Sequence, residues 1–348
     1  MIWTNWDPLE EVIVGNCTTS SNVADSKVKS LLDLILTETK EDLDNLAEYL
    51  TKMGIKVHRP KIVDFKETDF AEFKIFNPTQ PIVPRDQYLA YGNTIYQTYT
   101  SMPDRYLDSY AFYDIFLEMF DQGYNWLSQP PPMIKNFNDT ETWFLDSDHI
   151  YNSELSRKIL WHTATMFKCG DTLITNTNGP GSQLGLEWMR RNCSAKIISN
   201  PNTYSKNFGH IDHGFYMSDD ETVICVNNTW LPEVLKNKRI IDLSGLTEQF
   251  DYKTFISEEK NKHSLVWLEK WLSEWRGYSQ TTAFESNVLV VDPNNIIFSI
   301  EQPKVFKVLE KNGINCHVCS MRHGLFWDAG IHCATLDLKR RGKNRSII

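Results

Sequence analysis

Long apolar runs and flexible linkers are both missing from this chain of 348 residues. No run approaches the roughly 18 apolar residues that a membrane-spanning helix requires. The first residues, MIWTNWDPLEE, are acidic and have neither the basic nor the apolar region of a signal peptide. No Gly/Ser-rich or Pro-rich stretch separates two halves of the chain. These absences predict a cytoplasmic protein that folds as a single domain over residues 1–348.

Signatures of nucleotide and nucleic-acid binding are also absent. The net charge of −9 argues against nucleic acid and anionic membranes as partners. The sequence has no Walker loop, and Gly179-Pro-Gly181 has the wrong spacing for a dinucleotide fingerprint. The seven cysteines are odd in number and scattered, which predicts reduced thiols rather than a disulfide framework. Cys316 and Cys319 have CxxC spacing without a second ligand pair, which favours structural packing over a zinc or redox site.

What the sequence does contain is a repeated order of short strands and helices. The clearest copy lies near the C-terminus, with strands at 287–292 and 296–300, a helix at 303–311 and a third strand at 314–319. Weaker copies predict strands at 11–14, 55–59, 87–91, 94–99, 171–175, 196–199, 213–217, 222–226 and 239–243, and helices at about 37–53, 106–120, 184–191 and 232–236. About five ββαβ units predict a circular α/β repeat fold rather than a doubly wound sheet.

Two short segments carry candidate catalytic side chains. His210 and Asp212 stand two residues apart, so both point to the same side of an extended chain. Cys333 follows a glycine-containing loop, and a cysteine with a histidine elsewhere in an intracellular enzyme is a candidate nucleophile and base. A lone histidine or cysteine is more often structural, so this alternative stays open. Asp86 and Asp212 are candidates for paired hydrogen bonds to a guanidinium, with a solvated turn as the alternative for Asp86.

Blocks that span nearly the whole chain resemble the amidinotransferases, and they occur in the order of that family. The opening block resembles arginine:inosamine-phosphate amidinotransferases, and the later ones are shared with glycine amidinotransferase: Trp6–Gly15, Val83–Asp86, Leu186–Arg191, His210–Asp212 and His332–Arg341. The resemblance implies a five-bladed α/β-propeller of ββαβ units, the pentein type of guanidine-modifying enzymes, around a polar funnel. It also implies arginine and a primary amine as substrates, no metal or organic cofactor, and an assembly compatible with a homodimer.

The same resemblance implies a role for each matching residue. Cys333 would attack the guanidinium carbon and carry the amidino group, and His210 would serve as acid and base. Asp86 and Asp212 would hold the guanidinium. The chain departs from the family at His162, which stands where the family has an aspartate that orients the catalytic histidine.

Two further positions bear on the acceptor. Asn207 and Gly209 match positions that help to define the acceptor pocket in the family. Gly209 is smaller than the methionine common there, which argues against glycine as the natural acceptor. Three functions stay open: amidino transfer in toxin or antibiotic biosynthesis, hydrolysis of arginine or guanidine by the same cysteine chemistry, and ligand binding without catalysis.

Overall fold

The part of the chain that the structure describes contains five three-stranded sheets in the computed structural model. The structure describes residues 1–21, 26–63, 68–69, 74–75, 81–99, 105–132, 157–176, 181–200, 210–226, 228–246, 284–327 and 329–348. The strands of the five sheets are β1 (Leu9–Val14), β2 (Lys56–His58), β5 (Tyr88–Tyr91), β6 (Thr94–Gln97), β7 (Asn125–Ser128), β8 (Met166–Cys169), β9 (Thr172–Asn176), β10 (Lys196–Asn200), β11 (Phe215–Met217), β12 (Thr222–Cys225), β13 (Arg239–Asp242), β14 (Leu289–Asp292), β15 (Asn295–Phe298), β16 (Asn315–Val318) and β17 (Thr335–Arg340). A small separate sheet pairs β3 (Thr68–Asp69) with β4 (Lys74–Ile75).

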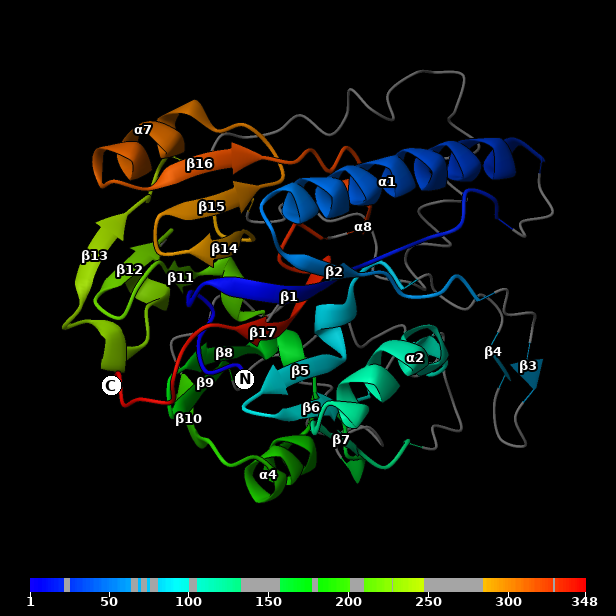
Figure 1. The fold of residues 1–348 in the computed structure, drawn as a ribbon, viewed down its shortest axis with the longest axis horizontal. Helices are drawn as coiled ribbons and strands as arrows, with labels where there is room; N and C mark the ends of the chain where they lie inside the picture. The colour runs from blue at the N-terminus through cyan, green and yellow to red at the C-terminus, as the bar shows by residue number, and fades with distance from the viewer. Residues whose placement is uncertain are drawn as a thin grey trace.

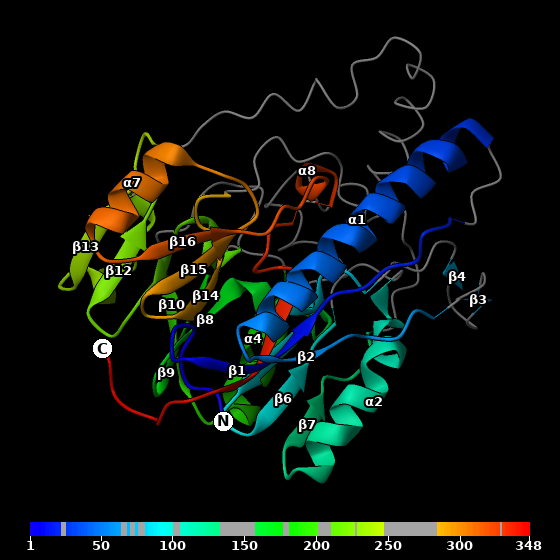
Figure 2. The same cartoon turned by 45° about the horizontal axis from the view of Figure 1, so that its top comes forward.

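Each of the five sheets follows one rule. The middle strand pairs antiparallel with the strand before it in the unit and parallel with the strand after it. A parallel connection needs a crossover, and the crossovers are α1 (Ser26–Lys52), α2 (Asp108–Asp121), α4 (Gln183–Asn192), the 3₁₀ turn Glu233–Leu235 and α7 (Pro303–Lys311). The predicted ββαβ repeat and the α/β-propeller class are therefore confirmed. Figures 1 and 2 show the five units following one another around a common centre.

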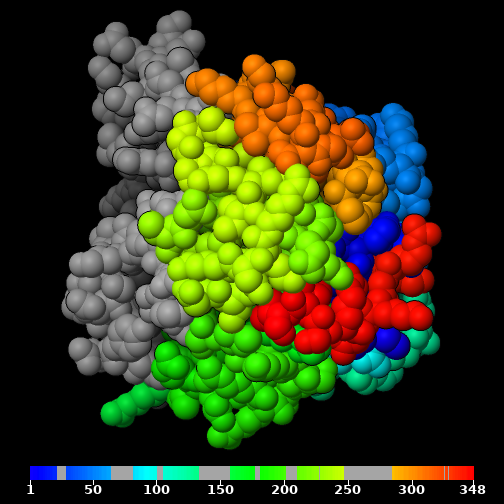
Figure 3. All heavy atoms as spheres, turned by 90° about the vertical axis from the view of Figure 1, so that its left-hand side faces the viewer, coloured from blue at the N-terminus to red at the C-terminus, as the bar shows by residue number. Residues whose placement is uncertain are grey.

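The first sheet is assembled from both ends of the chain. β17 pairs antiparallel with β1, so that Val14 lies opposite Thr335 and Ile13 opposite Leu336. Beyond β17, Arg345 binds Asp7 at 2.9 Å and Asp220 at 2.5 Å. Figure 3 shows the C-terminal end of the chain, in red, against the units of β8–β10 and β11–β13. The closure places the segment just before β17 inside the ring.

The core beneath α1 fixes that segment. Figures 1 and 2 both show α1 alongside β1 and β2, and the helix contacts both strands. Its buried leucines and isoleucine share one apolar cluster with Val12 and Val14 and with Ile331 and Ala334. The two residues that flank His332 and Cys333 are therefore anchored by close packing, which limits the movement of the thiol.

The structure differs from the sequence-based expectations at several elements. The helix expected at 37–53 begins at Ser26, and the one expected at 232–236 is the 3₁₀ turn Glu233–Leu235, too short for an α-helix. β7, β8 and β17 were not predicted. A short helix, α8 (Gly324–Trp327), precedes the cysteine segment. No helix in the described ranges combines the length and the apolar character that crossing a membrane requires.

Gly185 marks a close contact between α4 and the segment that leads to His162. A Cβ at this position would clash with the backbone carbonyl of Leu160. We expect Gly185→Ala to lower the free energy of unfolding by roughly 3 kcal/mol, because neither backbone can give way cheaply. Urea denaturation measures this change. Leu184→Ala, an exposed position on the same helix, is the matched control, and equal stability of the two variants would contradict the tight contact.

Candidate active site

A turn precedes the first strand of every unit, and these five turns carry polar or nucleophilic side chains. They are Asp86 before β5, His162 before β8, His210 before β11, Asn287 before β14 and Cys333 before β17. The turn Pro84–Asp86 contacts β17 and the turn Thr163–Thr165, which in turn contacts Ile211–His213. The turn before the first strand of each unit therefore contributes a side chain to a common site where the units meet.

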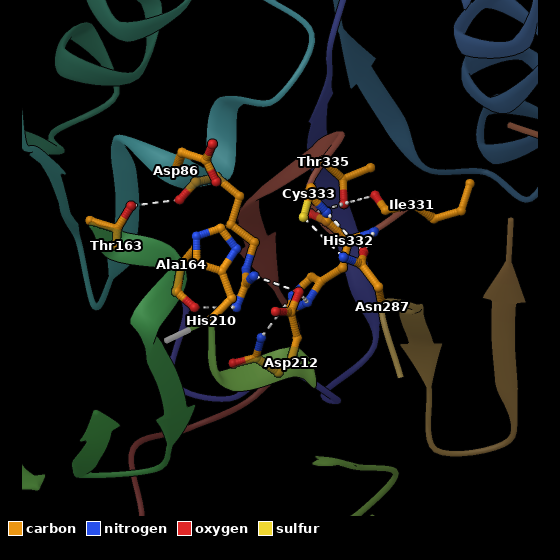
Figure 4. A network of polar contacts seen from close by, with 12 residues as sticks. Asp86, Thr163, Ala164, His210, Asp212, Asn287, Ile331, His332, Cys333 and Thr335 are labelled. Carbon is orange, nitrogen blue, oxygen red and sulfur yellow. Dashed lines mark hydrogen bonds and ion pairs between the residues drawn. The ribbon is translucent and has the colours of Figure 1, made fainter. Parts of the chain in front are cut away.

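Asn287 holds the thiol of Cys333 and the backbone around it. Its side-chain Nδ2 donates to Cys333 Sγ at 3.0 Å. Its Oδ1 accepts the backbone N–H groups of His332 at 3.0 Å and Cys333 at 3.3 Å. Figure 4 shows this group on one side of the site, with His210 and Ala164 on the other. The amide of one side chain thus fixes both the position of the sulfur and the conformation of its turn.

The electrostatic surroundings keep Cys333 protonated at rest. Burial raises the pKa of the thiol well above its usual value, and the charges of Asp212 and Asp86 raise it further. Arg85 and the hydrogen bond from Asn287 act in the opposite direction. Because the thiolate is the nucleophile, either a base or an incoming cation must act before Cys333 attacks a substrate.

Asp212 is the centre of a buried network between three units. Its Oδ2 accepts from Arg85 Nη1 at 2.6 Å and lies 3.1 Å from His332 Nδ1. Although burial alone would raise the pKa of Asp212, the charge of Arg85 and the hydrogen bond with His332 hold it well below its usual range. Asp212 Oδ1 has no hydrogen-bond partner among the described residues. One carboxylate oxygen thus holds the network together while the other is available to a ligand.

His332 is a neutral link in this network. Burial and the nearby charge of Arg85 lower the pKa of His332 to about 4. Asn5 accepts the N–H of Lys168 through its Oδ1, so its Nδ2 donates to His332 Nε2, 3.3 Å away. His332 Nδ1 therefore carries the proton and donates to Asp212. A cavity of about 20 Å³, roughly the room of one water molecule, is lined by Asn5, Arg85, His332 and Lys168.

Asp86 is held in a second buried ion pair. Arg105 Nη1 donates to Asp86 Oδ2 at 2.6 Å, while the same guanidinium binds Asp108 at 3.0 Å and the carbonyl oxygen of Val83 at 2.8 Å. Asp86 Oδ1 faces His162, with 4.0 Å between this oxygen and His162 Nδ1. Asp86 is therefore a fixed, buried carboxylate and not a solvated turn residue.

His162 and His210 form a buried pair of imidazoles. His210 Nε2 lies 3.1 Å from His162 Nδ1, close enough for one nitrogen to donate to the other. The ring planes are only 26° apart and their centroids 5.1 Å apart. His162 is thus the hydrogen-bonding partner of His210, and a histidine at this place is neutral or cationic but never anionic.

The structure brings five of the seven proposed site residues together in one region: Asp86, His162, His210, Asp212 and Cys333. Asn207 and Gly209 lie outside the described residues. Sequence reasoning missed Asn287, Arg85, Arg105 and His332. Arg85 and His332 stand next to Asp86 and Cys333 in the matching blocks, so the sequence offered a signal for these two. Asn287, just before a strand, offered none.

The similar proteins found by comparison match this chain over nearly its whole length. No family model matches the sequence. Inosamine-phosphate amidinotransferase 1 of Streptomyces griseus is 26% identical over 373 aligned positions, which cover 98% of this chain and 97% of that protein. The chain is homologous to amidinotransferases. Among solved structures, the Streptomyces griseus inosamine-phosphate amidinotransferase has a TM-score of 0.75 at 24% identity, with 99% of this chain and 98% of that one covered.

A second solved amidinotransferase shares the fold. The enzyme of the saxitoxin biosynthetic pathway from Microseira wollei matches with a TM-score of 0.75 at 23% identity, covering 100% of this chain and 99% of that one. A dimethylarginine dimethylaminohydrolase matches less well, with a TM-score of 0.56 at 9% identity. The homology therefore favours the transferases over the hydrolases.

Proposed function

We propose that this protein is an amidinotransferase that moves the amidino group of L-arginine to a primary amine in a specialised biosynthetic pathway. The observation that carries the proposal is the convergence of Cys333, His210, Asp86 and Asp212, all carried by turns that precede the first strands of the repeats. Whole-length homology to enzymes named for amidino transfer in specialised biosynthesis supports it. The hydrolase alternative has only the weaker structural matches behind it.

The first half-reaction transfers the amidino group to the enzyme. Arginine brings a permanent cation to Asp86 and Asp212, whose charges otherwise raise the pKa of the Cys333 thiol. The thiol loses its proton to His210, and the thiolate forms a bond to the central guanidinium carbon, with Asn287 donating to the sulfur. The bond from that carbon to the ε-nitrogen of arginine then breaks. His210 gives a proton to this nitrogen, so ornithine leaves and an amidino-cysteine remains.

The second half-reaction returns the thiol. The nitrogen of a primary amine attacks the amidino carbon and loses a proton to His210, and the carbon–sulfur bond breaks. Water in place of the amine would give hydrolysis.

The proposal places this enzyme in the cytoplasm, in keeping with seven cysteines that all remain free thiols. A homodimer stays a prediction.

The deciding experiment uses arginine labelled in its guanidino group. We expect stoichiometric ornithine, a gain of one amidino group on Cys333 by peptide mass spectrometry, and discharge of that label by added primary amines. Release of labelled urea without an amine, at a rate that amines do not change, would identify a hydrolase. Arginine binding without ornithine would leave only the binding function.

His162→Asp tests the histidine pair. A carboxylate beside His210 favours its protonated form, so His210 would protonate the leaving nitrogen up to higher pH. We expect the upper limb of the pH profile for single-turnover ornithine release to move upward by at least about one pH unit. His162→Asn, which has the same shape as the aspartate but no charge, is the control and should not move this limb. An unchanged profile in His162→Asp would remove His162 from the catalytic machinery.

A further inference from the structure

Three buried residues of the site carry the donor atoms of a metal centre. Asp86, His162 and His210 each offer one ligand atom, and these atoms all lie within 4.8 Å of one another. All three side chains are buried. They come from three successive units, so the spacing is set by the packing of the ring and not by a flexible loop.

The distances suit a zinc-like ion. Metal–nitrogen bonds of about 2.0–2.1 Å place two ligands of a tetrahedral ion roughly 3.3 Å apart. His162 Nδ1 and His210 Nε2 are 3.1 Å apart, and Asp86 Oδ1 is 4.0 Å from His162 Nδ1. A metal ion would replace the proton between the two imidazoles and would draw the carboxylate oxygen of Asp86 inward.

Arg105 orients the carboxylate of this ligand set. Arg105 binds the outer oxygen of Asp86 at 2.6 Å and is itself held by Asp108 at 3.0 Å. Such supporting hydrogen bonds fix the direction of a metal-binding carboxylate. Two imidazoles and one carboxylate are the ligand set of many catalytic zinc sites, in which a fourth position remains for water or another donor.

Two other clusters fit a metal ion less well. His210 also lies near Asp212 and His213, but these three residues come from a single turn and not from three packed units. On the outside of the first sheet, Glu11, His58 and Glu118 form a third group. Lys56 binds both glutamates there, at 2.9 and 2.7 Å, so a cation already balances their charge.

We propose that Asp86, His162 and His210 form a binding site for a divalent transition-metal ion of the zinc class. Coordination of His210 would remove the acid and base of the reaction, and coordination of Asp86 would remove a guanidinium ligand. The ion is thus an inhibitor that competes with arginine and not a cofactor. The inhibition rests on the proposed function, whereas metal binding itself rests only on the three side chains.

Titration of the full-length protein with Co²⁺ tests the binding. Tetrahedral Co²⁺ absorbs visible light, so the spectrum reports both stoichiometry and geometry. We expect one ion per chain, and at least about tenfold weaker binding in His162→Asn. His213→Asn is the matched control, since His213 neighbours His210 but lies outside the set, and it should bind as the parent does. Cys333→Ser should also keep the band.

Several results would overturn the metal site. These are the absence of a saturable band, equal affinity of His162→Asn and the parent, and loss of the band in Cys333→Ser or His213→Asn. Circular dichroism of each variant verifies folding, and His162→Gln provides a second substitution if the asparagine variant is unfolded. Binding is measured without substrates, so a failed amidino transfer assay does not affect it. If transfer occurs, Zn²⁺ should raise the arginine KM and leave kcat unchanged.

Discussion

Replacing Cys333 with serine should abolish amidino transfer and leave the fold intact. The hydroxyl is close in size to the thiol and can still accept the hydrogen bond from Asn287, but it is a far weaker nucleophile than a thiolate. We expect ornithine formation to fall by roughly 10⁴-fold or more, as for the loss of an essential nucleophile in other covalent enzymes. Intact-mass measurement should show no amidino adduct after incubation with arginine.

The control for this experiment is a second cysteine. Cys316 is a half-buried thiol on β16, and burial raises its pKa to about 12. Cys316→Ser should keep the adduct and change the rate by less than about threefold, because a thiol with a raised pKa outside the site takes no part in the reaction. An adduct that survives in Cys333→Ser would move the nucleophile to another residue.

Asp212→Asn should have the second-largest effect, this time on arginine binding. The asparagine keeps the shape but removes the negative charge that faces Arg85 at 2.6 Å. An unpaired buried guanidinium costs about 3–5 kcal/mol. If the substrate guanidinium depends on the same carboxylate, a loss of roughly 3 kcal/mol corresponds to about a hundredfold weaker binding. Calorimetry with arginine in a Cys333→Ser background measures this change without turnover.

A distant carboxylate provides the matched control. Asp42 is also buried and also binds an arginine, with 2.9 Å to Arg322 Nε, but it lies on α1. Asp42→Asn should therefore destabilise the protein without altering arginine affinity. If Asp212→Asn binds arginine within about threefold of its parent, the guanidinium is held elsewhere. Thermal unfolding of both variants separates a loss of binding from a loss of fold.

Local sequence patterns predicted the units whose elements are regular. Pro303 opens α7 and Gly313, with a φ of 81°, follows its end, so the predicted helix at 303–311 has the bounds observed. β17 was missed because only two of its six residues, Leu336 and Leu338, are apolar. Asp337 is buried through ion pairs with Lys168 and Arg340, so a strand of the ring looked like a polar segment.

The candidate site was likewise predicted in part and missed in part. Cys333, His210, Asp86 and Asp212 were proposed from chemistry and from matching blocks, since their residue types are rare and reactive. Asn287 was not, because an asparagine before a strand is common and its bond to the sulfur joins residues 46 positions apart. The pairing of His162 with His210 likewise depends on the contact between two units.

The sequence by itself determined the repeat and the class of fold and predicted Cys333 as the nucleophile, because periodicity and residue chemistry are local properties. Tertiary structure decided which side chains meet: the closure of β1 with β17 sets Cys333 into the ring, and five equivalent turns converge there. It also decided the charge state of the site. Arg85 holds the pKa of Asp212 low and burial holds that of Cys333 high, and such effects arise only from distances in space.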